Sequence, residues 1–134
     1  MLDKELLQLA IEARKNSYSP YSGFRVGAAL LGQSGKVYLG CNVENAAYTP
    51  TNCAERMAVF KAVSEGERAF TAIAIVGGKG EEPAEFCAPC GVCRQVLAEF
   101  CDLDFRIVLG TPENIRVYTL KELLPLSFGK ADLN

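Results

Sequence analysis

The chain carries Cys53-Ala54-Glu55 and, further along, Pro89-Cys90-Gly91-Val92-Cys93. The three cysteine thiolates of these two segments can bind one metal ion, and Glu55 supplies a carboxylate beside the first of them. A structural zinc site is normally closed by four protein ligands, whereas a catalytic zinc site keeps three and leaves the fourth position for water. The two segments therefore predict a hydrolytic zinc centre with Glu55 as its general base.

The cysteine and histidine content supports metal chemistry over disulfides. The chain has six cysteines and no histidine. Without a secretory signal, cysteines in a small protein are more often metal-binding or catalytic than paired. The lack of histidine excludes Ser-His and Cys-His nucleophile pairs, so proton transfer near neutral pH needs a tuned carboxylate or a metal-activated water. Two alternatives stay open: a structural zinc site, and a redox pair formed by Cys90 and Cys93.

Length and charge limit the class of protein. A chain of 134 residues can bury one sizeable core, which predicts a single domain spanning residues 1–134. The net charge of −2 and the pI near 5.2 disfavour a nucleic-acid partner, because such modules usually present a basic face. No apolar run is long enough for a membrane span, and the first residues show no signal-peptide core, so we expect a cytoplasmic protein without a membrane partner.

Hydrophobic periodicity predicts an α/β fold. The expected elements are a helix capped by Asp3 over 3–16, a strand hairpin over 25–31 and 37–41, a helix capped by Asn52 over 53–65, a strand over 70–77, a polar loop over 78–88, a helix opened by Pro89 over 89–100, and strands over 105–109 and 115–119. A hairpin followed by strands that alternate with helices implies a mixed sheet covered on both faces.

Both cysteine segments fall at predicted helix starts. Unpaired backbone N–H groups and the positive end of the helix dipole favour thiolate over thiol at such positions. Three thiolates and a divalent zinc together carry a net charge of −1, which weakens the metal as a Lewis acid. The two helix N-termini and Arg56 can offset that charge.

Beyond these segments, the chain resembles the small homotetrameric cytidine deaminases of the three-cysteine zinc type. The resemblance runs essentially from end to end and includes the signature of zinc-dependent deaminases, Phe24, and the segments Asn42-Val43-Glu44-Asn45 and Leu124-Pro125-Leu126-Ser127-Phe128-Gly129. It implies a three-layer α/β/α sandwich with a mixed five-stranded sheet and a homotetramer.

The resemblance also assigns roles around the zinc. It implies one zinc ion per chain bound by Cys53, Cys90 and Cys93. Glu55 is then the proton shuttle, and Arg56 hydrogen-bonds to the ligand sulfurs and reduces their negative charge. Spacing alone would also allow Cys87 as a ligand. The resemblance places it outside the site, and for Cys41, Cys87 and Cys101 alike we expect buried or loop cysteines.

The same resemblance implies the substrate contacts. Asn42 and Glu44 hold the ribose hydroxyls, and the carboxylate of Glu44 disfavours a phosphorylated substrate. Phe24 packs against the pyrimidine, and Phe128 enters the site of a neighbouring subunit. Tyr48 is expected near the pocket or an interface, with its role open.

The implied reaction is hydrolytic deamination of cytidine and 2′-deoxycytidine to uridine and 2′-deoxyuridine with release of ammonia, as in pyrimidine salvage. The nearest alternative enzyme is a deaminase of another aminated heterocycle, such as the nucleoside antibiotic blasticidin S. Deamination of a polynucleotide fits the acidic charge less well. The non-enzyme alternative is a structural zinc or redox-sensing protein, which predicts no need for Glu55.

Overall fold

The computed structural model describes residues 1–83 and 86–134. Residues 84–85, within the loop predicted over 78–88, lie outside the described residues. The elements are α1 (Asp3–Arg14), β1 (Arg25–Gly32), β2 (Val37–Cys41), α2 (Ala54–Ser64), β3 (Phe70–Gly78), α3 (Gly91–Phe100), β4 (Arg106–Thr111), β5 (Asn114–Thr119), α4 (Leu120–Leu123) and a 3-10 turn (Lys130–Asp132).

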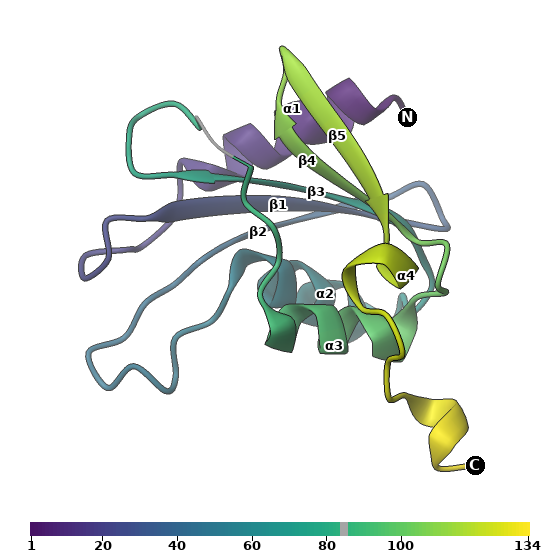
Figure 1. The fold of residues 1–134 in the computed structure, drawn as a ribbon. Coiled ribbons are helices and arrows are strands. Elements are labelled where there is room, and N and C mark those ends of the chain that lie inside the picture. Colours follow the sequence, from purple (N-terminus) through teal and green to yellow (C-terminus); the bar gives the residue numbers. More distant parts are fainter. Residues whose placement is uncertain (84–85) are drawn as a thin grey trace.

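The strands form a mixed five-stranded sheet in the order β2-β1-β3-β4-β5. β1 is antiparallel to both β2 and β3, β3 is parallel to β4, and β4 is antiparallel to β5. Helix α1 covers one face of the sheet, and α2 and α3 cover the other (Figure 1). This arrangement confirms the predicted α/β/α sandwich and its mixed sheet.

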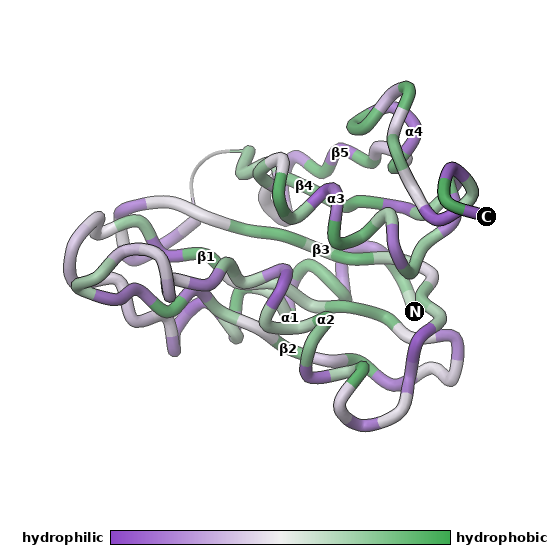
Figure 2. The backbone as a smooth tube through the Cα atoms, turned by 90° about the horizontal axis from the view of Figure 1, so that it is seen from below, coloured by the Kyte–Doolittle hydropathy of each residue, from purple (hydrophilic) through white to green (hydrophobic). Residues whose placement is uncertain are grey.

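Each face of the sheet has its own apolar core. Leu6, Leu7 and Ala10 of α1 pack with Ala74 and Val76 on one face. The other face packs against α2 and α3 through a larger buried cluster. The central strand β3, whose residues are nearly all buried, runs through the middle of the molecule as a mostly hydrophobic segment (Figure 2). Burial on both faces explains why its sequence is mostly apolar and does not alternate between apolar and polar residues.

Two glycines allow helices to touch the sheet backbone. A Cβ atom added at Gly27 would lie 2.1 Å from the carbonyl oxygen of Ala10 in α1. A Cβ atom added at Gly40 would lie 2.3 Å from the carbonyl oxygen of Ala54 in α2. The contact at Gly40 sets how closely the first turn of α2 approaches β2, and that turn carries Glu55.

The predicted helix starts are each displaced. Leu2, not Asp3, precedes the first turn of α1, and its backbone N–H donates to the carboxylate of Glu5 at 2.8 Å. Cys53, not Asn52, is the N-cap of α2, because Asn52 pairs with Val43 in an isolated antiparallel bridge. At α3, Cys90 is the N-cap, so the helix begins at Gly91 and Pro89 lies just before it.

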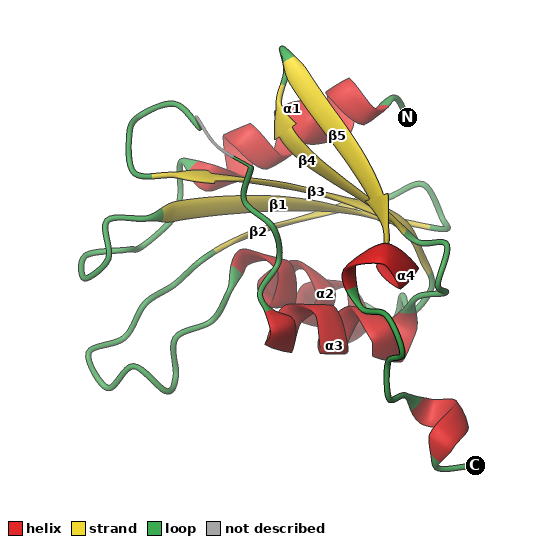
Figure 3. Ribbon diagram, in the orientation of Figure 1, coloured by secondary structure: helices red, strands yellow, loops and turns green. Residues whose placement is uncertain are grey.

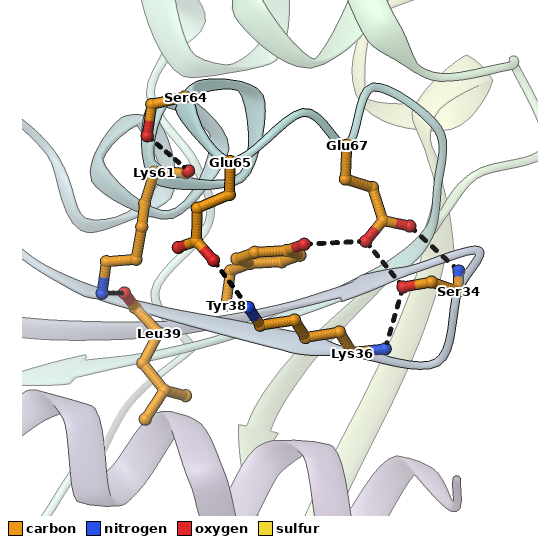
Figure 4. Close-up of polar contacts among 8 residues, drawn as sticks. All are labelled: Ser34, Lys36, Tyr38, Leu39, Lys61, Ser64, Glu65 and Glu67. Atoms are coloured by element: carbon orange, nitrogen blue, oxygen red, sulfur yellow. Dashed lines mark hydrogen bonds and ion pairs between the residues drawn. The ribbon is translucent and has the colours of Figure 1, made fainter.

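A carboxylate holds the β1–β2 turn against the segment between α2 and β3. Glu67 accepts hydrogen bonds from the backbone N–H of Ser34 at 2.9 Å and from the hydroxyl of Tyr38 at 2.9 Å (Figure 4). Hydrogen bonds from the backbone and the hydroxyl of Ser34 lower the pKa of Glu67 below its ordinary value. Lys36 pairs with Glu65 at 2.6 Å beside this network.

Buried Arg14 fixes the other end of the sheet. Its guanidinium donates to the carbonyl oxygens of Arg25 at 3.0 Å, Gly78 at 2.6 Å and Glu81 at 2.8 Å. The end of β3 and the start of the loop toward α3 are thereby tied to α1.

Among residues 1–83 and 86–134, the helices include none of the length and apolarity that a membrane crossing requires.

We predict that Gly40→Ala lowers the free energy of unfolding by about 2 kcal/mol or more. The added Cβ would overlap backbone atoms of α2, which cannot move aside as a flexible side chain can. Thermal unfolding measures the effect. Gly129→Ala is the matched control, since an added Cβ there meets nothing within 4 Å. Equal stability of the two variants would contradict the close packing of α2 on β2.

Glu67→Gln tests the carboxylate network through pH. Because the pKa of Glu67 is lowered in the folded chain, its contribution is complete above the unfolded pKa of about 4.3 and disappears as pH falls through the folded value. The difference in melting temperature between the natural chain and Glu67→Gln should therefore be largest near pH 7 and shrink below about pH 4. Exposed Glu99→Gln should show no such difference. A difference independent of pH would contradict the role of the charge.

Candidate zinc site

The topology brings the two cysteine segments together. Strands β2 and β3 are both antiparallel to β1, so their carboxyl ends lie at the same edge of the sheet. The chain leaves β2 toward α2 and leaves β3 toward α3 at that edge. Figure 3 shows both helices beginning on the same side of the molecule, so residues at the two helix starts can share one site.

The three predicted ligands form a cluster with the spacing of a zinc site. The Sγ atom of Cys90 lies 3.9 Å from that of Cys53 and 3.4 Å from that of Cys93. All three sulfurs lie within 4.8 Å of one another. Two sulfurs bound at about 2.3 Å to a tetrahedral zinc are about 3.8 Å apart. The cluster therefore fits zinc, and within the described residues it offers three protein ligands.

The helix starts and Arg56 favour the thiolate form. Cys53 and Cys90 are the N-caps of α2 and α3, where the helix dipoles favour negative charge. Nη2 of Arg56 donates to Sγ of Cys53 at 3.3 Å. The hydrogen bond with Cys93 and, to a smaller extent, that from Arg56 lower the pKa of Cys53 to about 5. Burial of the thiol acts in the opposite direction and raises the pKa. The hydrogen bond with Cys53, followed by burial, raises the pKa of Cys93.

Glu55 lies in the first turn of α2 with 5% of its surface exposed. Burial raises the pKa of Glu55 to about 7, with the charge of nearby Cys53 adding to the effect. A carboxylate that is costly to ionise and shares a cavity with the sulfur cluster is suited to move protons near neutral pH.

A cavity of about 210 Å³ joins Glu55 to the ligands. Its wall is formed by Val26, Asn42, Thr51, Asn52, Cys53, Ala54, Glu55, Cys87, Ala88 and Cys90. A substrate in this cavity can contact the carboxylate and the open side of the sulfur cluster together.

Asn42 is fixed by its own neighbours, and among residues 1–83 and 86–134 one of its two amide N–H donors has no partner. Its Oδ1 accepts from the backbone N–H of Val26 at 2.9 Å and from the hydroxyl of Ser17. Its Nδ2 donates to the carbonyl oxygen of Phe24 at 2.8 Å. Since an amide NH₂ has two donors, one N–H remains for a ligand.

Glu44 lines a second hollow of about 250 Å³, together with Tyr21, Ser22, Tyr48 and Thr51. Thr51 belongs to the walls of both hollows. The carboxylate of Glu44 accepts from the backbone N–H groups of Tyr21 at 3.0 Å and Ser22 at 3.1 Å, and from the hydroxyl of Ser22. The hydroxyl of Ser22 makes the largest contribution to lowering the pKa of Glu44.

The two predicted phenylalanines lie outside the walls of the 210 Å³ cavity. Phe24 is half-buried, and its ring packs against Gly77 beside the thiol of Cys87, which does line the cavity. Phe128 lies on the C-terminal segment, 60% exposed. The ring of Tyr48 stacks edge-on with Tyr21, with centroids 6.2 Å apart, and its φ of 63° is unusual for a bulky residue.

The remaining cysteines are unpaired but not equivalent. Cys41 lines a separate groove beside β2 and α2, and Cys101 packs against the core at the end of α3. Cys87 is not in the ligand cluster, which agrees with the expectation of a loop cysteine, and its side chain lines the cavity. Burial raises its pKa to about 12, which keeps it a thiol.

Sequence reasoning missed several residues that shape the cavity. Thr51 connects the two hollows, and Ser17 and Ser22 hold Asn42 and Glu44. For Ser17 and Ser22, the signal available was the run of serines and tyrosines before Phe24.

Comparisons with known proteins agree with this geometry. The family described as the cytidine and deoxycytidylate deaminase zinc-binding region matches residues 1–110, which include all three ligands and Glu55. The chain belongs to this deaminase family. A cytidine deaminase from Sporosarcina psychrophila is 48% identical, covering 98% of this chain and 94% of its own. One from Halalkalibacterium halodurans is 49% identical, covering 99% of each chain.

A solved structure shares the deaminase fold. The crystal structure of cytidine deaminase from Burkholderia pseudomallei superposes with a TM-score of 0.87 at 46% identity, covering 96% of this chain and all of that one. Membership of a zinc-binding family identifies the metal for which the three-sulfur cluster is suited.

We predict that Arg56→Gln weakens zinc binding by about 10- to 100-fold, because the thiolate of Cys53 loses a charged hydrogen-bond donor. Competition with a chelator of known zinc affinity measures the change. Exposed Arg68→Gln, which removes the same charge away from the sulfurs, should bind zinc as the natural chain does. Unchanged affinity in Arg56→Gln would show that the guanidinium does not support the ligand.

Proposed function

We propose that this chain, as one catalytic domain over residues 1–134, hydrolyses cytidine and 2′-deoxycytidine to uridine and 2′-deoxyuridine with release of ammonia. The observation that carries the proposal is a three-sulfur cluster whose cavity also contains the buried carboxylate of Glu55. Two relatives 48% and 49% identical over nearly the whole chain are named cytidine deaminase, which supports the substrate.

In the proposed site, Cys53, Cys90 and Cys93 hold one zinc ion per chain. When bound, zinc supplies a Lewis acid that lowers the pKa of water toward about 7. Helix N-termini and Arg56 balance the negative charge of the three thiolates. This balance preserves the electrophilic character that the reaction needs.

Glu55 moves the protons. Its carboxylate takes a proton from the attacking water as the water oxygen bonds to C4 of the pyrimidine, and donates that proton to N3. It then transfers the second proton of the same water to the exocyclic amino group. The C4–N bond breaks, ammonia leaves, and the oxygen stays on C4 as the carbonyl of uridine.

Asn42 and Glu44 favour a free nucleoside. The remaining N–H of Asn42 can donate to one ribose hydroxyl. Glu44 accepts three hydrogen bonds and so has about one acceptor site left for a ribose hydroxyl. Its negative charge repels a phosphate at the same position. Phe24, packed beside the cavity-lining thiol of Cys87, supports the wall on which the pyrimidine lies.

We further propose a homotetramer in which Phe128 enters a neighbouring subunit's site. The 60% exposed ring of Phe128 and the fully exposed Leu126 support a partner surface, because large apolar side chains gathered on one segment are costly in water. A place in pyrimidine salvage and in the cytoplasm fits a nucleoside substrate and six unpaired cysteines, since reducing compartments keep thiols available for metals.

The proposal is tested by incubating the zinc-loaded protein with cytidine and following the ultraviolet spectrum. We expect conversion to the uridine spectrum by the natural chain. Glu55→Ala should retain zinc and lose about 10²- to 10⁴-fold or more of kcat, because proton transfer is lost while the ligands remain. Glu99→Ala, which removes an exposed carboxylate from α3, should leave kcat unchanged. Inactivity of the zinc-loaded natural chain, or full activity of Glu55→Ala, would refute the proposal.

Removal of the Glu44 carboxylate should affect binding more than chemistry. Glu44→Ala should raise KM for cytidine by about 10- to 100-fold, the range of a hydrogen bond to a charged group, with a smaller change in kcat. With 2′,3′-dideoxycytidine, which lacks both hydroxyls, the natural chain and Glu44→Ala should have similar KM values. An equal loss with both substrates would place Glu44 outside the sugar contact.

A further inference from the structure

Arg94 links the zinc ligands to the end of α4. Its Nε donates to the carbonyl oxygen of Pro89 at 2.7 Å, and its Nη1 donates to the carbonyl oxygen of Leu123 at 2.7 Å. Its backbone N–H donates to the carbonyl oxygen of Cys90 at 2.9 Å. Arg94 therefore contacts the predicted ligand Cys90 and also Pro89, the residue that precedes it.

The adjacent residue of α3 holds the C-terminal segment, defined as residues 124–134. Nε2 of Gln95 donates to the carbonyl oxygen of Phe128 at 2.8 Å. In the described part of the chain, the other hydrogen bonds of residues 125–134 are local, such as that from the backbone of Gly129 to Asp132. Neighbouring residues of one helix turn thus fix the ligand loop and the C-terminal segment.

These contacts depend on each other. The carbonyl of Leu123 is at the C-terminal end of α4, where it has no partner within the helix. The planar guanidinium satisfies this carbonyl and that of Pro89 with fixed geometry, so displacement of either weakens the contact with the other. Metal binding orders the loops that carry its ligands, which makes the position of Pro89 dependent on the ion.

We propose that Arg94, supported by Gln95, is a positioning residue that couples zinc binding to docking of the C-terminal segment. Zinc holds the Cys90 loop, the loop holds Arg94, and Arg94 holds the end of α4. Because such coupling is reciprocal, the docked segment retains the zinc by the same factor with which zinc retains the segment. The inference rests on zinc binding in the proposed function, and it makes the placement of Phe128 depend on the metal of its own chain.

Hydrogen exchange and zinc release test the coupling without any substrate. In the natural chain, removal of zinc should increase amide exchange in residues 124–129. In Arg94→Met, exchange there should already be high with zinc bound and should change little on its removal. Zinc should also pass to a chromogenic chelator about tenfold faster or more from Arg94→Met than from the natural chain. Lys121→Met, which removes an exposed positive charge from α4, should behave as the natural chain on both readouts.

Two milder variants, Arg94→Lys and Gln95→Ala, test the same proposal if Arg94→Met does not fold. Arg94→Lys retains the positive charge but cannot donate to the carbonyl oxygens of Pro89 and Leu123 with the fixed geometry of a guanidinium. It should show amide exchange and zinc release between those of the natural chain and Arg94→Met. Gln95→Ala should increase exchange at residues 124–129, whereas Glu99→Ala on the same helix should not. Exchange in the natural chain that is independent of zinc, or zinc release from the Arg94 variants at the natural rate, would overturn the proposal. Because neither readout uses cytidine, either result leaves the test of the deaminase reaction separate.

Discussion

Convergence of three thiol sulfurs at the starts of two helices is the constraint on which the structure depends. Neither helix can supply the cluster alone, because Cys53 belongs to the start of α2 and Cys90 and Cys93 to the start of α3. The sheet solves this by running β2 and β3 in the same direction on either side of β1, so the loops that follow them reach the same edge. The bare backbone at Gly40 then lets α2 lie close enough to complete the site.

The charge balance of the cluster explains much of its surroundings. Three thiolates carry more negative charge than a divalent ion neutralises, so the site needs nearby positive groups that are not themselves metal ligands. Two helix N-termini and the guanidinium of Arg56 provide it, while Glu55 is kept in a buried position where its ionised form is costly. In the proposed function the cavity separates two tasks: the sulfurs bind the metal and the carboxylate of Glu55 transfers protons.

Periodicity predicted the mixed sheet covered by helices, and the spacing of a few chemically distinctive residues predicted a cysteine metal centre beside Glu55. The choice of Cys53, Cys90 and Cys93 over Cys87 came from the family resemblance, because spacing alone allowed either. Sequence reasoning misplaced the cap of α2 by one residue, since nothing local shows that Asn52 pairs with Val43. It also could not show that Cys87 lines the cavity, because that depends on how its thiol packs into the space that Gly77 leaves on β3. The link from Pro89 through Arg94 to Leu123 was hidden for a different reason. The acceptors of Arg94 are backbone carbonyl groups, which every residue carries, so no residue type marks them in the sequence.

The central claim is that the cluster holds a catalytic zinc with an open position and not a closed structural one. X-ray absorption at the zinc edge of the metal-loaded protein tests it most directly. The account predicts three sulfur neighbours at about 2.3 Å and one oxygen neighbour at about 2.0–2.2 Å. Four sulfur neighbours would contradict it, and would identify Cys87, the other thiol of the cavity wall, as the residue that closes the site.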